Sequence, residues 1–192
     1  LYAYTGFPRS LNALGTLQNV LKERKDKGIT DEEGRDASPL PQDYDALKQG
    51  TEVQTKVSGR AFNYTFAPAT DYYLKAHLFG DIFARDNLTH SQRELVTVSA
   101  LSGLEGCESQ LKSHVNGARN MGLSEAEIRS IPAVLEAKVG AREAWRARKA
   151  IACKGSDVPH RPAKLGIRQV FHRQQLPRAA LYGQSACVER HI

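Results

Sequence analysis

Two amphipathic helices joined by a short glycine-bounded corner form the strongest hydrophobic pattern in the chain. Thr89 and Gln92 have the spacing of a capping box, which predicts the start of the first helix. Gly122 has the position of a glycine that follows a helix C-terminus. The pattern therefore predicts an antiparallel helix pair over residues 89–103 and 107–121.

Apolar residues at helical spacing predict more helices on both sides of this pair. They recur every three or four positions between residues 7 and 21, and residues 71–85 carry a broad apolar face. Ser124 opens a second capping box, and the helix after it runs towards Arg148 with Pro132 inside, where we expect a kink or a break. We therefore predict an all-α protein of about five or six helices, with little or no β-sheet.

The first five residues have the pattern of the last turns of a helix whose beginning is absent. Gly6 breaks this helix, and Pro8 restarts it at a first-turn position, where a missing N–H costs nothing. The chain opens on Leu1 rather than Met. We therefore expect an upstream part to be missing, and an export signal in that part would go unseen.

Residues 28–68 carry no sustained helical period. Their prolines and glycines predict an extended connection of about forty residues, which is unusually long for a compact domain. Phe62, Tyr64 and Phe66 alternate with polar residues, as in a short extended segment on a surface. Two interpretations stay open for this connection: an ordered arm that crosses a neighbouring subunit, or a flexible loop.

The positive charge of the chain is concentrated in residues 151–192. This tail carries seven Lys/Arg against two Asp/Glu, whereas residues 1–150 carry 20 against 19. The tail also lacks a long periodic stretch, so we expect it to be poorly ordered, and we assign it no function. Because the body is nearly neutral, we expect no nucleic-acid partner.

Composition excludes several further classes of protein. No apolar run approaches the ~20 residues needed to span a bilayer, so we expect no membrane partner. Cys107, Cys153 and Cys187 form no C-x-x-C motif, and their odd number favours a reducing, cytoplasmic location. The six histidines show no metal-ligand spacing, so we predict no metal site and no cofactor.

Candidate chemistry lies on the central helix pair. Glu94 has no Lys or Arg three or four positions away, so no local salt bridge explains it, and a carboxylate in apolar company suits proton transfer. His114 is a candidate general base because histidine titrates near neutral pH. The alternatives are a structural Glu94, capped or paired with His90, and a core histidine bonded to a backbone carbonyl.

The second helix carries three further candidates. Cys107 and Gln110 share one helix face with His114, at positions i, i+3 and i+7. Glu108 and Gln110 are candidate substrate contacts, or they face solvent near the helix N-terminus, where glutamate is favoured in any case.

Three motifs in this region resemble the carboxymuconolactone decarboxylase family, which includes alkylhydroperoxidase D. They are R-E-L-V-T-V-S-A, G-C-E-S-Q-L-K-S-H-V-N-G-A and N-M-G-L-S-E-A-E-I. The segment from Tyr2 to Pro8, together with residues 11–13, is similar to the Y-x-G-x-P segment that ends a family repeat. The resemblance implies an alkylhydroperoxidase D-like helical bundle that assembles into homo-trimers or hexamers. It also implies tandem repeats, with residues 1–27 the end of a truncated first repeat and residues 69–150 a domain like that of the family.

The resemblance leaves the activity, and whether the protein is an enzyme, open. The alkylhydroperoxidase D branch has a C-x-x-C before the histidine, whereas here Cys107 occupies the first cysteine position and Gln110 the second. Positions i and i+7 lie about 10.5 Å apart along a helix, so His114 is too far away to deprotonate Cys107 directly.

We therefore expect a lyase of decarboxylase type that acts on a small carboxylated, lactone-like substrate. Glu94 and His114 would transfer its protons. One alternative is a peroxiredoxin-like antioxidant that uses Cys107 with an external thiol. Another is a non-catalytic helical oligomer.

Overall fold

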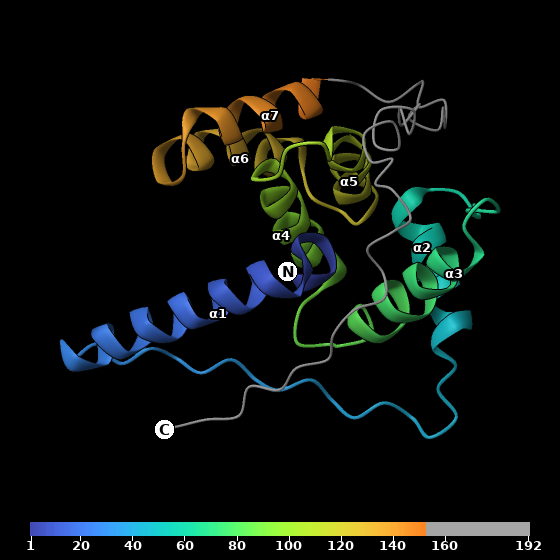
Figure 1. Cartoon of the computed structure of the whole chain (residues 1–192), viewed down its shortest axis with the longest axis horizontal. Coiled ribbons are helices and arrows are strands. Elements are labelled where there is room, and N and C mark those ends of the chain that lie inside the picture. Colours follow the sequence, from blue (N-terminus) through green and yellow to red (C-terminus); the bar gives the residue numbers. More distant parts are fainter. Residues whose placement is uncertain (153–192) are drawn as a thin grey trace, which may run out of the picture. The chain divides into compact units, whose positions relative to one another are not determined.

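The structure, a computed structural model, describes residues 1–152. Its elements in chain order are α1 (Tyr2–Asp26), α2 (Ala46–Ser58), α3 (Pro68–Tyr73), the π-helix η1 (Leu74–Ile82), α4 (His90–Ser102), α5 (Glu108–Asn120), α6 (Glu125–Lys138) and α7 (Ala141–Ala152) (Figure 1). These residues contain helices and no strand, which confirms the predicted all-α fold. The predictions for the tail, including Cys153 and Cys187, lie outside the described residues.

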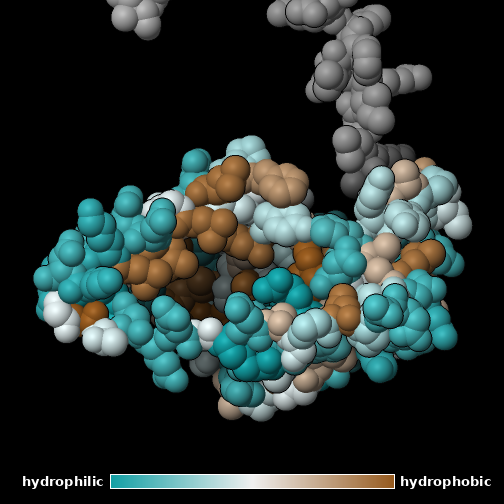
Figure 2. Space-filling model, turned by 90° about the horizontal axis from the view of Figure 1, so that it is seen from below, coloured by the Kyte–Doolittle hydropathy of each residue, from teal (hydrophilic) through white to brown (hydrophobic). Residues whose placement is uncertain are grey.

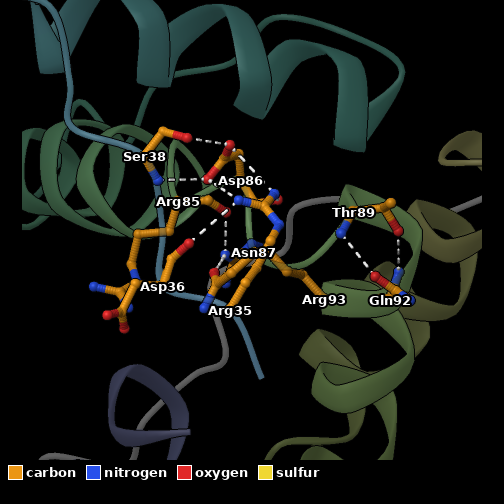
Figure 3. Close-up of polar contacts among 9 residues, drawn as sticks. All are labelled: Arg35, Asp36, Ser38, Arg85, Asp86, Asn87, Thr89, Gln92 and Arg93. Carbon is orange, nitrogen blue, oxygen red and sulfur yellow. Dashed lines mark hydrogen bonds and ion pairs between the residues drawn. The ribbon is translucent and has the colours of Figure 1, made fainter. Parts of the chain in front are cut away.

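Helices α4 and α5 form the predicted central pair. The Thr89 hydroxyl accepts a hydrogen bond from the Gln92 N–H (3.2 Å), and the Gln92 side chain accepts one from the Thr89 N–H (2.8 Å), so the predicted capping box is present (Figure 3). Gly122 has a φ of 96°, a conformation that glycine adopts without steric cost.

The main core lies between α4, α5, α6 and α7. Val98, Ile128 and Ala144 are fully buried in it. The stretch from Ser124 towards Arg148 is broken into two helices by a turn between α6 and α7, but the break does not lie at Pro132, where we expected a kink or a break.

The turn lies at Val139 and Gly140, whose N–H groups both donate to the Leu135 carbonyl at 2.8 and 2.9 Å. Pro132 lies inside α6 without ending it. The turn allows α7 to pack against α6, which buries its small alanine side chains.

The prediction of an extended connection over residues 28–68 was wrong for residues 46–58, which form α2. Asp45 caps this helix by accepting a hydrogen bond from the Lys48 N–H (2.9 Å), and Gly59 ends it in the left-handed conformation. Only a few apolar side chains mark the buried face of α2, because close packing against η1 uses Gly50 instead. A Cβ on Gly50 would lie 1.9 Å from the Lys75 carbonyl oxygen.

The connection before α2 has no regular secondary structure and is anchored to the turn after η1. Asp86 accepts hydrogen bonds from the Ser38 N–H and the Ser38 hydroxyl, each at 2.8 Å. Arg35 forms an ion pair with the same carboxylate at 3.2 Å (Figure 3). Further along, the rings of Phe62, Tyr64 and Phe66 contact one another edge to face.

Helix α1 contains the predicted break. Gly6 has non-helical angles (φ 76°, ψ 162°), and Pro8 follows in the restarted helix. Tyr4, before the break, packs against the main core and against a second buried cluster, which includes Val57 and Phe79.

Beyond the break, the apolar side chains of α1 remain exposed, and Figure 2 shows hydrophobic side chains gathered around a hollow on the side where α1 lies. The exposed apolar side chains of α1 are those of Phe7, Leu11, Leu14, Leu17, Val20 and Leu21, each 44–66% exposed. No helix within residues 1–152 has both the length and the apolar character needed to cross a membrane.

Candidate functional site

The central helix pair brings Glu94 and His114 into direct contact. Glu94 Oε2 lies 2.8 Å from His114 Nδ1, although the residues are 20 positions apart. The Glu94 side chain is fully buried and that of His114 is 14% exposed. The alternative pairing of Glu94 with His90 is not formed, and the His90 ring instead contacts Phe83 edge-on.

This contact fixes the role of each imidazole nitrogen. An ionised carboxylate only accepts hydrogen bonds, so His114 Nδ1 carries the hydrogen that Glu94 accepts. In a neutral ring Nε2 is then the basic nitrogen. A small fraction of the His114 ring remains exposed to solvent. The pair therefore combines a buried carboxylate that orients the ring with a base that a ligand can approach.

Tyr4 is a third member of the site, and the sequence analysis did not name it as one. Its ring contacts the His114 ring edge-on, with centroids 5.3 Å apart. Burial raises the pKa of Tyr4 well above the usual value; the Thr97 hydroxyl acts in the opposite direction and the Glu94 charge adds to the increase. The Thr97 hydroxyl itself donates to the Arg93 carbonyl (2.9 Å). The tyrosine of the Y-x-G-x-P motif was the sequence signal for this residue.

Two buried polar atoms at this contact, Glu94 Oε1 and the Tyr4 hydroxyl, have no hydrogen-bond partner. An unsatisfied buried polar atom costs about 1–3 kcal/mol, so native proteins retain few of them. Unpaired acceptors and donors beside an oriented imidazole are suited to binding a polar ligand or water.

Gly117 makes room for the Glu94 carboxylate on the neighbouring helix. A Cβ at this position would lie 2.8 Å from Glu94 Oε2 and 2.9 Å from Val57 Cγ1. A side chain here would therefore push the carboxylate away from His114.

The other predicted site residues lie at the start of α5. Cys107 is the N-cap residue, partly buried, and packs against the main core. Glu108 is exposed, and the N–H groups of Glu108 itself and of Gly106 lower the pKa of its carboxyl group. Gln110 is exposed and accepts a hydrogen bond from the Ser109 hydroxyl (2.9 Å). No hydrogen bond or ion pair within residues 1–152 joins these side chains to the Glu94–His114 pair, so their roles stay predictions.

Two cavities lie away from the pair. One of about 840 Å³ lies between α5, α6 and α7, and another of about 430 Å³ lies between the start of α1, the connection before α2 and η1. Neither is lined by Glu94 or His114. In the described part of the chain, no group of three His, Cys, Asp or Glu side chains could hold a metal ion.

Comparison with known proteins relates the helices that carry the site to one family. Residues 68–152 match the model of the carboxymuconolactone decarboxylase family. Peroxisomal protein 2 of Saccharomyces cerevisiae is 26% identical over 87 residues, which cover 44% of this chain and 31% of the yeast protein. The match thus spans about a third of the yeast relative, whose name states no activity. The chain carries a domain of the carboxymuconolactone decarboxylase family at residues 68–152.

Proposed function

We propose that this domain catalyses a proton-transfer reaction of the lyase or decarboxylase type on a small carboxylated, lactone-like substrate. The observation that supports the proposal is the 2.8 Å contact between a fully buried Glu94 and a His114 ring that reaches solvent. A fixed carboxylate orients an imidazole and stabilises its protonated form, which is the arrangement that general acid–base catalysis requires.

The reaction divides into two steps. Cleavage of the bond between the carboxylate carbon and the ring releases carbon dioxide and leaves the bonding electron pair on the substrate. His114, protonated at both nitrogens, then donates its Nε2 proton to the ring carbon that bore the carboxylate and returns to the neutral form. Glu94 accepts the hydrogen bond from His114 Nδ1 throughout and stays ionised, so its charge compensates the imidazolium before the proton is delivered.

Tyr4 supports this reaction from the other side of the ring. Because its pKa is raised, its hydroxyl stays protonated at neutral pH and is available as a hydrogen-bond donor. A developing negative charge on the substrate would give this unpaired donor a partner.

The alternative function, a peroxiredoxin-like antioxidant activity at Cys107, has less support. A peroxidase cycle needs a thiolate and a second thiol to resolve the oxidised sulfur. Cys107 has no such second thiol nearby in the sequence, because Gln110 stands at the C-x-x-C partner position. Such an activity would therefore depend on an external thiol.

Two assays on the same preparation distinguish the functions. We expect substrate-dependent release of carbon dioxide from a carboxylated muconolactone, with one deuterium incorporated into the product carbon in D₂O. We expect no peroxide consumption in the presence of dithiothreitol. Peroxide consumption without carbon dioxide release would favour the thiol function, and inactivity of the folded protein in both assays would favour a non-catalytic oligomer.

A further inference from the structure

A second hydrogen-bonded cluster of ionisable groups lies outside the Glu94–His114 site. Asp81 Oδ2 lies 2.8 Å from His77 Nδ1, and His77 Nε2 is hydrogen-bonded to the Tyr2 hydroxyl. The three side chains line the cavity of about 430 Å³, a volume within the range of small-molecule sites. His77 and Asp81 lie on the π-helix η1, a type of helix that is rare and frequent at functional sites.

These contacts determine which hydrogen bonds the Tyr2 hydroxyl can still form with a ligand. The Asp81 carboxylate accepts, so His77 Nδ1 carries the hydrogen and, in a neutral ring, Nε2 accepts. The Tyr2 hydroxyl therefore donates its only hydrogen to His77 Nε2. Its oxygen retains lone pairs for a ligand, so this position favours a ligand group that donates a hydrogen bond.

Arg85 gives the same cavity a positive charge. It is exposed and lines the cavity, and none of the ion pairs within residues 1–152 uses its guanidinium. Burial and then the charge of Arg85 lower the pKa of Arg93, so the two cations are close enough to repel each other. An anion bound to Arg85 would relieve this repulsion, and a carboxylate fits its planar fork of donors.

The remaining wall is apolar and comes from a different part of the chain. Ala37 and Leu40 in the connection before α2, together with Ile82 on η1, line the cavity. This connection is held in place by the hydrogen bonds of Ser38 to Asp86. The cavity thus combines the Arg85 cation, the Asp81 carboxylate that contacts His77, a hydrogen-bond acceptor and a small apolar surface.

We propose that this cavity binds a small hydroxy acid, with the carboxylate on Arg85 and the hydroxyl donating to the oxygen of Tyr2. The site is separate from Glu94 and His114 and does not depend on the reaction proposed for them. It discriminates a hydroxy acid from the corresponding simple acid through Tyr2, and from the corresponding amide through Arg85.

Binding of three small probes to the full chain tests this site. Lactate carries both groups, propionate lacks the hydroxyl and lactamide lacks the charge. In NMR titrations at about pH 8, where histidine is ordinarily neutral, we expect lactate to shift the His77 ring and Arg85 side-chain signals. We expect propionate to bind about 2- to 10-fold more weakly, the effect of one hydrogen bond, and lactamide to leave these signals unchanged.

Two variants assign the two contacts. Tyr2→Phe should abolish the preference for lactate over propionate while both still bind, and Arg85→Gln should abolish binding of both. Arg60→Gln, at another exposed arginine, is the matched control and should bind as the wild type does. Equal shifts with lactate and lactamide, no shift with lactate, or unchanged binding by Arg85→Gln in a folded protein would each overturn the proposal.

Discussion

The position of a single carboxylate depends on the absence of a side chain on the facing helix. Glu94 Oε2 lies where a Cβ of residue 117 would be 2.8 Å away, and Val57 closes the space on the other side. Glu94 is fully buried, so its carboxylate cannot shift into open space. Its contact with His114 therefore requires glycine at position 117.

Gly117→Ala should both destabilise the protein and impair the site. We expect a loss of about 1–3 kcal/mol in the free energy of unfolding, as for other overpacked cores. We also expect a fall in turnover of about 10²-fold, because a displacement of about 1 Å misaligns a catalytic group. Chemical denaturation and the carbon dioxide assay measure the two effects.

Gly15→Ala is the matched control, since nothing lies within 4 Å of a Cβ at this helical position. It should be neutral or stabilise α1 by about 0.5–1 kcal/mol. A Gly117→Ala variant as stable and as active as the Gly15→Ala variant would show that the close approach is unimportant.

Local sequence was sufficient to find Glu94 and His114, because both lie on strongly periodic helices and Glu94 lacks a cation within helical reach. It was insufficient for Tyr4, which approaches the site from a distant segment through tertiary packing. The same limitation applies to Gly117, whose importance comes from a neighbouring helix.

At the scale of elements, helix boundaries followed from local caps, whereas the presence of α2 did not. The capping box at Thr89 is a short-range signal and was found in the sequence. Helix α2 packs through Gly50 against η1, and η1 in turn presents Gly80 to α2, where a Cβ would lie 2.3 Å from the Ala46 carbonyl oxygen. Glycines that pack backbone on backbone leave no apolar period, so the sequence pattern predicts a connection here instead of a helix.

The connection before α2 should detach from the turn after η1 in acid. Hydrogen bonds from the Ser38 N–H and then the Ser38 hydroxyl, followed by Arg35, lower the pKa of Asp86 to about 2. A lowered pKa means that ionised Asp86 stabilises the contact above the usual aspartate value of 3.8, and that this contribution is lost as the pH falls towards 2. The amide signal of Ser38, followed by NMR from pH 6 downwards, measures the loss.

Asp86→Asn should remove this acid transition and loosen the connection at all pH values. Asp43→Asn, an exposed change in the same connection, should leave it unaltered. A Ser38 amide that changes at the ordinary aspartate value, or that titrates normally in Asp86→Asn, would contradict the assignment.

At the scale of the whole molecule, α1 presents an apolar stripe that no segment within residues 1–152 covers. Its side chains are 44–66% exposed, from Phe7 to Leu21. Burial of a large apolar side chain contributes about 1.5–3 kcal/mol, so an exposed row of them favours association. We propose that copies of this chain associate through α1, in keeping with the trimers or hexamers that the sequence resemblance implies.

Leu14→Lys should weaken this association, because a charge would enter the contact between copies. Sedimentation velocity at micromolar concentration should show an oligomer for the wild type and a smaller species for Leu14→Lys. Asn12→Lys, on the opposite face of α1, adds the same charge and should leave the oligomer intact. A wild-type chain that sediments as a monomer would contradict the proposal.

Turnover of three single variants on a carboxylated muconolactone tests the proposed Glu94–His114 centre most directly. Glu94→Gln and His114→Ala should each lower the rate of carbon dioxide release by about 10²–10⁴-fold, the usual contribution of a proton-transfer group. Both should keep the helical circular dichroism of the wild type, and Cys107→Ser should remain nearly as active as the wild type. The opposite order, with Cys107→Ser the most damaging change and His114→Ala fully active, would contradict the assignment.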